Sequence, residues 1–152
     1  AELASAYLYF SMSAHCYAAN LPGAGHWMGI QAHEELLHGV KLFNFLRDRE
    51  AAIVLADVKA PPSSWKTTLA VFEDAQRAER GQTERINSLI ELALSEKDHA
   101  TNALLQWYAS EQVEEENTLH DIIQKIKMIG DNGAGLFMLD QELAKRVIAP
   151  VA

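Results

Sequence analysis

Glutamates on four separate helical stretches of this sequence have the spacing of metal ligands. Glu35 and His38 are three residues apart, which places a carboxylate and an imidazole on one face of a helix, one turn apart. Gln112 and Glu115 repeat this spacing with an amide in place of the imidazole. The four glutamates are Glu2, Glu35, Glu79 and Glu115. Carboxylate and imidazole ligands together suit Fe(II), and also Mn(II) or Zn(II), so these residues indicate a centre for divalent metal ions.

The same residues fall on lines that should face a common core. Core-facing residues of a helix bundle recur at alternating spacings of three and four. Four such lines are Glu2, Ala6, Tyr9, Ser13 and Cys16; Met28, Gln31, Glu35, His38, Leu42 and Phe45; Phe72, Ala75, Glu79, Thr83, Ile86 and Ile90; and Tyr108, Gln112, Glu115, Leu119, Ile122 and Ile126. Each line is apolar or small except for a short polar interruption that includes a glutamate. Buried carboxylates are costly unless compensated, and two divalent cations would neutralise four of them. Di-iron carboxylate bundles use a comparable set, with Glu from two helices and Glu-x-x-His from two others.

Each glutamate taken singly has a simpler interpretation. Glu79 lies close to Arg77 and Arg80 and could form a surface ion pair. The run 114–116 could be a solvated acidic face. Four interruptions at similar depths on four lines favour a dinuclear metal centre over these separate explanations.

Long helices are needed to hold these lines, and helical periodicity dominates the sequence. Only 8 Gly and 4 Pro are available for turns. We expect helices over about 1–20, 23–49, 67–95, 98–129 and 134–146. The segment 50–65 has no helical pattern; its roughly 16 residues can span about 50 Å, more than the roughly 37 Å of a 25-residue helix. These features predict an all-α, ferritin-like four-helix bundle with one long crossover between helices two and three, plus a short fifth helix.

Composition narrows the class of protein. The 152 residues, 49% of them hydrophobic and 22% charged, suit a single globular domain over 1–152. A net charge of −8 without a basic patch argues against nucleic acid as a partner. The lone Cys16 excludes a disulfide framework and a thiolate-built metal centre, and we expect it to be a small buried hydrophobe. No apolar run reaches the roughly 18 residues of a membrane helix, so we expect a cytoplasmic protein without a membrane partner.

Several strings resemble the bacterial and archaeal non-haem ferritins. They are AHEELLH at 32–38, APPSSW at 60–65, EKDHAT at 96–101, LLQWYASEQVEEE at 104–116 and GLFMLDQELAKR at 135–146. The resemblance covers essentially the whole chain and runs without gaps from the first helix to the fourth. Members of that family have further helical turns before the position of Glu2, so we expect the native chain to extend before Ala1.

The resemblance implies a role for each matching position. The first iron site of a ferroxidase centre would use Glu2, Glu35 and His38, with Glu35 bridging to the second site. The second site would use Glu79 and Glu115, with Gln112 as a polar neighbour or weak ligand. A third iron position would use Glu34, Glu111, Glu114 and Glu115. Electrons could come from Tyr9 and Trp107. The family implies a homo-oligomeric shell of 24 subunits that oxidises Fe(II) with O2 or peroxide and stores the product as a ferric mineral.

Related classes differ at identifiable residues. Bacterioferritins need a second Glu-x-x-His and a haem-ligating Met, and here Gln112-x-x-Glu115 and Leu36 stand at those places, so no haem is expected. Rubrerythrins carry a four-Cys domain that a single Cys excludes. Two alternatives stay open at the level of sequence. One is a structural cage subunit whose carboxylates only nucleate mineral; the other is a di-metal oxidase or peroxidase that acts on an organic substrate.

Overall fold

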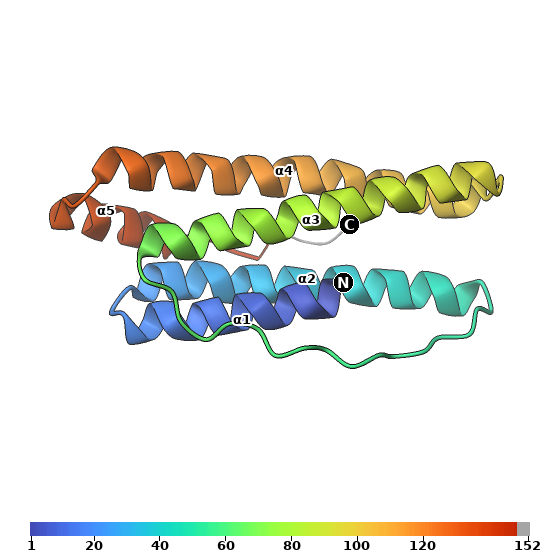
Figure 1. Cartoon of the computed structure of the whole chain (residues 1–152), viewed down its shortest axis with the longest axis horizontal. Coiled ribbons are helices and arrows are strands. Elements are labelled where there is room, and N and C mark those ends of the chain that lie inside the picture. The colour runs from blue at the N-terminus through green and yellow to red at the C-terminus, as the bar shows by residue number, and fades with distance from the viewer. Residues whose placement is uncertain (149–152) are drawn as a thin grey trace. The chain divides into compact units, whose positions relative to one another are not determined.

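The computed structural model describes residues 1–148, which form five helices (Figure 1). They are α1 (Glu2–Ala18), α2 (Pro22–Asp48), α3 (Thr68–Ser95), α4 (His99–Ile129) and α5 (Gly133–Leu143). Each lies within about three residues of the helix predicted from periodicity. The last four residues of the predicted single domain, 149–152, lie outside the described residues.

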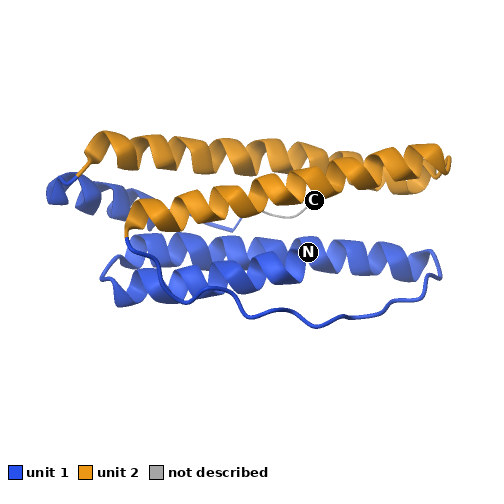
Figure 2. Cartoon of the chain, in the orientation of Figure 1, with its two compact units in different colours: residues 1–66, 131–152 blue, residues 67–130 orange. Residues whose placement is uncertain are grey.

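The chain divides into two compact units (Figure 2). Unit 1 contains residues 1–66 and the segment from residue 131 onward, and unit 2 contains residues 67–130. In unit 1, α1 packs along α2, and α5 packs against α2. Unit 2 is the hairpin of α3 and α4.

Helix ends follow the signals in the sequence. Thr67 accepts a hydrogen bond from the Ala70 N–H at 3.1 Å, and Asp98 accepts one from the Thr101 N–H at 3.1 Å, so each caps the helix that follows it. Asn132 caps α5 in the same way. Gly130 ends α4 with φ of +57°, a left-handed conformation that glycine adopts without steric cost.

The long connection after α2 returns along the α1–α2 hairpin of unit 1 (Figure 1). It leaves α2 after Asp48 and reaches α1 near its other end. There the Ser11 hydroxyl donates to the Pro62 carbonyl at 2.5 Å, and the Trp65 ring lies edge-on to His15 with centroids 5.3 Å apart. The segment therefore spans the length of the hairpin, as its extended length allows.

The predicted core lines are largely buried. All five residues of the α1 line are buried, and so are Met28, Gln31, Glu35 and His38 on α2. Leu42 and Phe45, farther along α2, are half-buried. Among the helices of residues 1–148, none is long and apolar enough to cross a membrane.

Candidate metal centre

Three predicted ligands meet within unit 1. Glu2 at the start of α1, and Glu35 and His38 on α2, each offer one ligand atom, and these atoms lie within 4.8 Å of one another. Their exposed fractions are 6%, 1% and 4%, so all three are removed from solvent. Two carboxylates and one imidazole at this separation form a partial coordination sphere for a divalent cation with mixed O and N ligands.

Burial keeps His38 neutral. The pKa of His38 falls from an ordinary 6.5 to about 4, mainly because burial disfavours the charged imidazolium and secondarily because Lys41 lies nearby. A metal ion binds only the unprotonated imidazole nitrogen. At neutral pH the ring is therefore already in the form that a metal requires, at 4.0 Å from Glu35 Oε1 through Nδ1.

Glu35 is held in place by its own helix. The Gln31 amide, one turn earlier on α2, donates to Glu35 Oε1 at 3.2 Å, and Gln31 itself is buried. This contact fixes the orientation of the carboxylate, as side chains around a metal ligand commonly do. Gln31 was predicted to face the core, but sequence gave it no role at the centre.

Glu34 has a different environment from Glu35. Its carboxylate forms an ion pair with Arg146, from the segment after α5, with Oε2 and Nη2 at 2.5 Å. Glu34 was predicted to belong to a third iron position, and the structure pairs it with a cationic side chain of the same chain.

Two further residues of the α1 line are fully buried. Tyr9 is 0% exposed and lies two turns after Glu2 on the same helix. Cys16 is buried as expected; burial, with the Asp140 carboxylate nearby, raises the pKa of its thiol to about 11. At neutral pH Cys16 is therefore a protonated thiol and a poor metal ligand or nucleophile.

In unit 2, Glu79 and Gln112 contact each other across the α3–α4 hairpin. The Gln112 amide nitrogen donates to the Glu79 backbone carbonyl at 3.1 Å and to Glu79 Oε2 at 3.2 Å. Glu79 is 0% exposed, so it is not the surface partner of Arg77 or Arg80 that its neighbours in sequence suggested. Arg77 pairs with Asp74 instead.

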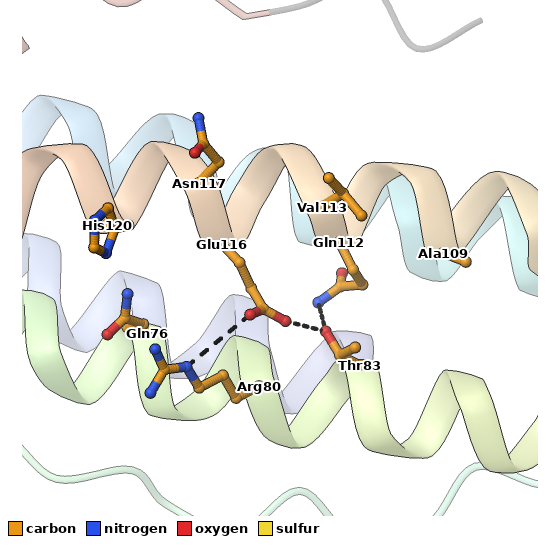
Figure 3. A pocket seen from close by; sticks show the side chains of 9 residues that line it. All are labelled: Gln76, Arg80, Thr83, Ala109, Gln112, Val113, Glu116, Asn117 and His120. Carbon is orange, nitrogen blue, oxygen red and sulfur yellow. Dashed lines mark hydrogen bonds and ion pairs between the residues drawn. The ribbon is translucent and has the colours of Figure 1, made fainter.

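Thr83 connects this pair to a groove on the same hairpin (Figure 3). Its hydroxyl lies 3.3 Å from the Gln112 amide nitrogen and 2.5 Å from Glu116 Oε1, and Glu116 Oε2 lies 4.0 Å from Arg80. Because the single hydroxyl proton is given to the charged Glu116, Thr83 can only accept from Gln112. The groove, about 390 Å³ in volume, is lined by Gln76, Arg80, Thr83, Ala109, Gln112, Val113, Glu116, Asn117 and His120.

The remaining predicted residues of α4 differ in burial. Glu115 and Glu111 are half-buried, and Glu114 is exposed. Trp107 is half-buried, and its ring is perpendicular to that of Tyr108 with centroids 4.8 Å apart.

Comparison with known proteins decides the family. Residues 1–129 match the family described as the ferritin-like domain. The chain belongs to the ferritin family. It is 43% identical to a bacterial non-heme ferritin of Campylobacter jejuni over 140 residues, which are 92% of this chain and 84% of the relative. It is 37% identical to one of Staphylococcus epidermidis, covering 95% of this chain and 87% of that one.

Solved structures agree with the sequence comparison. An open pore ferritin from the archaeon Archaeoglobus fulgidus superposes with a TM-score of 0.95 at 44% identity, over 96% of this chain and 90% of that chain. The predicted family and the predicted fold class, an all-α ferritin-like four-helix bundle with a short fifth helix, are confirmed. Iron storage is the function that membership of the ferritin family implies.

Proposed function

We propose that this ferritin chain is a ferroxidase subunit that oxidises Fe(II) at a dinuclear centre and stores the product as ferric mineral. The observation that carries the proposal is that the ligand atoms of Glu2, Glu35 and His38, all in unit 1 and all buried, lie within 4.8 Å of one another. Two buried carboxylates side by side are unfavourable in a protein that only needs to fold. A divalent cation bound by both would turn this repulsion into attraction.

The second iron position is assigned from sequence and family membership. We assign it to Glu79 and Glu115, with Gln112 as a neighbour or weak ligand and Glu35 as the bridge. The burial of Glu79 and Gln112 supports this assignment, because helix residues that merely face solvent would not be buried. We assign the third iron position to Glu34, Glu111, Glu114 and Glu115.

The reaction needs two iron ions because O2 is reduced in steps of paired electrons. Each Fe(II) gives up one electron to become Fe(III), and O2 takes both electrons and leaves as hydrogen peroxide after binding two protons. When peroxide is the oxidant, two further Fe(II) ions reduce it to water. The protein contributes by holding both ions close together and by matching their charge with carboxylates. Tyr9 and Trp107 would supply electrons when O2 is reduced beyond peroxide.

The alternatives left open by sequence are less well supported. A subunit that only nucleates mineral would need no neutral imidazole held beside two buried carboxylates. An oxidase for an organic substrate usually needs a second Glu-x-x-His, and Gln112-x-x-Glu115 stands in its place. We further propose that the subunits assemble into a homo-oligomeric shell of 24 in the cytoplasm, with iron and O2 or peroxide as partners.

Glu35→Gln tests the proposed centre. The amide has nearly the volume of the carboxylate and can still accept from Gln31, but it has no charge with which to bridge two metals. We expect the initial rate of Fe(II) oxidation in stopped-flow measurements to fall more than about tenfold, the change that about 1.4 kcal/mol of barrier produces. Glu84→Gln, at an exposed position of α3, is the matched control and should oxidise iron like the parent.

The melting temperature of the metal-free variant shows whether Glu35 is a metal ligand or a structural residue. Removing one of two neighbouring buried charges relieves repulsion and desolvation, so metal-free Glu35→Gln should melt no lower than the metal-free parent. Fast oxidation in the variant would refute the bridging role. A melting temperature several degrees lower would show that Glu35 mainly serves the fold.

A further inference from the structure

The segment that follows α5 is anchored on α2 through Arg146. The guanidinium donates from Nη2 to Gln31 Oε1 at 2.7 Å and to Glu34 Oε2 at 2.5 Å. Its central carbon lies 4.2 Å above the ring of Trp27, within the range of a cation–π contact. The Arg146 carbonyl lies 2.9 Å from His26 Nε2. Four side chains on one stretch of α2 therefore hold a single arginine.

This contact explains why α5 is shorter than its periodicity predicts. The sequence pattern continues to Arg146, but the helix ends at Leu143. Residues 144 and 145 form a turn, and Arg146 leaves the helical path. Charge-assisted hydrogen bonds to a largely buried carboxylate are stronger than the neutral backbone bonds of one further helical turn.

The ion pair involves a carboxylate that we assign to iron. The Glu34 side chain is 12% exposed and that of Arg146 is 20% exposed, so the pair is largely shielded from solvent. Glu34 directly precedes Glu35, and Gln31 contacts both Glu35 and Arg146. A divalent ion at Glu34 would face the guanidinium charge at close range in a poorly screened environment, which is strongly unfavourable. The ion and the arginine therefore exclude each other.

We propose that Arg146 is a displaceable internal cation that occupies Glu34 until a third iron ion replaces it. The inference rests on the proposed function, because it assigns Glu34 to the third iron position. Displacement frees Arg146 from Gln31 and Glu34 together, so iron binding there also loosens residues 144–148. Arg146 thus sets the affinity of the third position relative to the first two, and it couples that position to the end of α5.

The hydrogen bonding of the Arg146 guanidinium is consistent with its displacement from Glu34. Arg146 Nη1 is buried and has no hydrogen-bond partner among residues 1–148. A buried donor without a partner costs roughly 1–3 kcal/mol, so the anchored state is less stable than a fully satisfied arginine would be.

Zinc titration of the assembled, metal-free protein tests the competition, because Zn(II) accepts the same ligands and is not oxidised. In titration calorimetry we expect two equivalents of Zn(II) to bind tightly to each subunit and further Zn(II) to bind at a weaker class of sites. Arg146→Gln should tighten the weaker class about tenfold, the effect of about 1.4 kcal/mol, and change the tight class by less than about twofold. Arg146→Lys, which keeps the charge, should resemble the parent. The matched control is Lys145→Gln, which removes one positive charge from the adjacent exposed residue and should also resemble the parent.

Hydrogen exchange on the unaltered protein is an independent test of whether Zn(II) displaces Arg146. The Lys145 and Arg146 amides donate to Glu142 and Leu143 carbonyls at 3.1 and 3.2 Å. Zn(II) added beyond the tight equivalents should speed exchange across 144–148. Identical weak binding in Arg146→Gln and the parent, or unchanged exchange, would overturn the proposal. Absence of the tight class in the parent would instead contradict the dinuclear centre, and exchange would still decide whether metal displaces Arg146.

Discussion

The protonation of His38 links the proposed metal centre to the stability of the metal-free protein. Its pKa is about 4 in the folded chain and near 6.5 in an unfolded one. Between these values the unfolded chain binds more protons, so the free energy of unfolding decreases as pH is lowered from about 6.5 to about 4. The full shift corresponds to roughly 3 kcal/mol, lost in that window and present above it.

Urea unfolding of metal-free protein between pH 4.5 and 7.5 measures this effect. Carboxylates also titrate near the acidic end, so the informative quantity is the difference between the parent and His38→Gln. We expect the variant to lose less stability on acidification. His33→Gln, at an exposed position of the same helix, should follow the parent. Parallel curves for the parent and His38→Gln would show that His38 is not the titrating group.

Local periodicity was sufficient to place Glu2, Glu35 and His38 on core-facing lines, where the structure buries them, because a helix places residues three, four and seven apart on one face. The same reasoning placed Thr83 on a core line but could not show that its hydroxyl lies between Gln112 and Glu116. That contact depends on how α3 and α4 pack. Arg146 had no local signal, because its partners on α2 precede it by more than 100 residues.

At the scale of elements, the N-terminus of α2 lacks a cap from the residues next to it, and α5 provides one. Leu21 precedes α2 and provides no side-chain cap, and the first turn contains no acidic residue. Asp140 of α5 accepts from the Gly23 and Ala24 N–H groups at 3.0 and 2.8 Å instead. A carboxylate at a helix N-terminus also interacts favourably with the helix dipole. The cap of α2 thus comes from 116 residues later in the chain, which explains why sequence did not reveal it.

Gly23 is required for this cap. A Cβ atom there would lie 1.7 Å from the Asp140 carbonyl oxygen, so any other residue must push α5 away from α2. The starts of both helices were predictable from Pro22 and from the stretch 130–133. The contact between α2 and α5 was not predictable, because a glycine in a sequence does not indicate which backbone segment packs against it.

Asp140→Ala should lower the free energy of unfolding by about 1–3 kcal/mol, because it leaves two N–H groups of a buried helix start without their acceptor. Gly23→Ala should also destabilise, since it displaces the same carboxylate. Combined, the two changes should cost less than the sum of their separate effects, because each disrupts one contact. Denaturant unfolding of the two single variants and the double variant measures this, with Gln141→Ala at an exposed neighbouring position as control. Strict additivity would show that the two residues act independently.

At the scale of the whole molecule, α1 presents apolar side chains to solvent on a face distinct from its core line. They recur at helical spacing and are about half exposed: Leu3, Tyr7, Phe10 and Tyr17. The core line predicted for this helix did not include these residues, and periodicity alone could not show that a second apolar face stays exposed. Contiguous exposed apolar patches commonly mark protein–protein interfaces.

This face should be buried when subunits assemble. A shell of 24 chains of 16.9 kDa would have a mass of about 400 kDa. Light scattering should report a particle of that order for the parent. Replacing both Tyr7 and Phe10 by Glu should shift the protein to species of one or a few subunits, because each interface would then bury charges without partners. Circular dichroism should still show full helix content, since neither side chain belongs to the core line.

Met128→Glu is the matched control for the assembly experiment. Met128 is 86% exposed but lies on α4, a different helix from the apolar face of α1. A single exposed apolar residue is normal on a monomer surface, so this variant should assemble like the parent. If the double variant still formed the large particle, the α1 face would not be an assembly contact. If the parent itself remained a monomer or dimer, the proposed shell would be wrong, while the oxidation experiment on Glu35 would still decide the chemistry of the subunit.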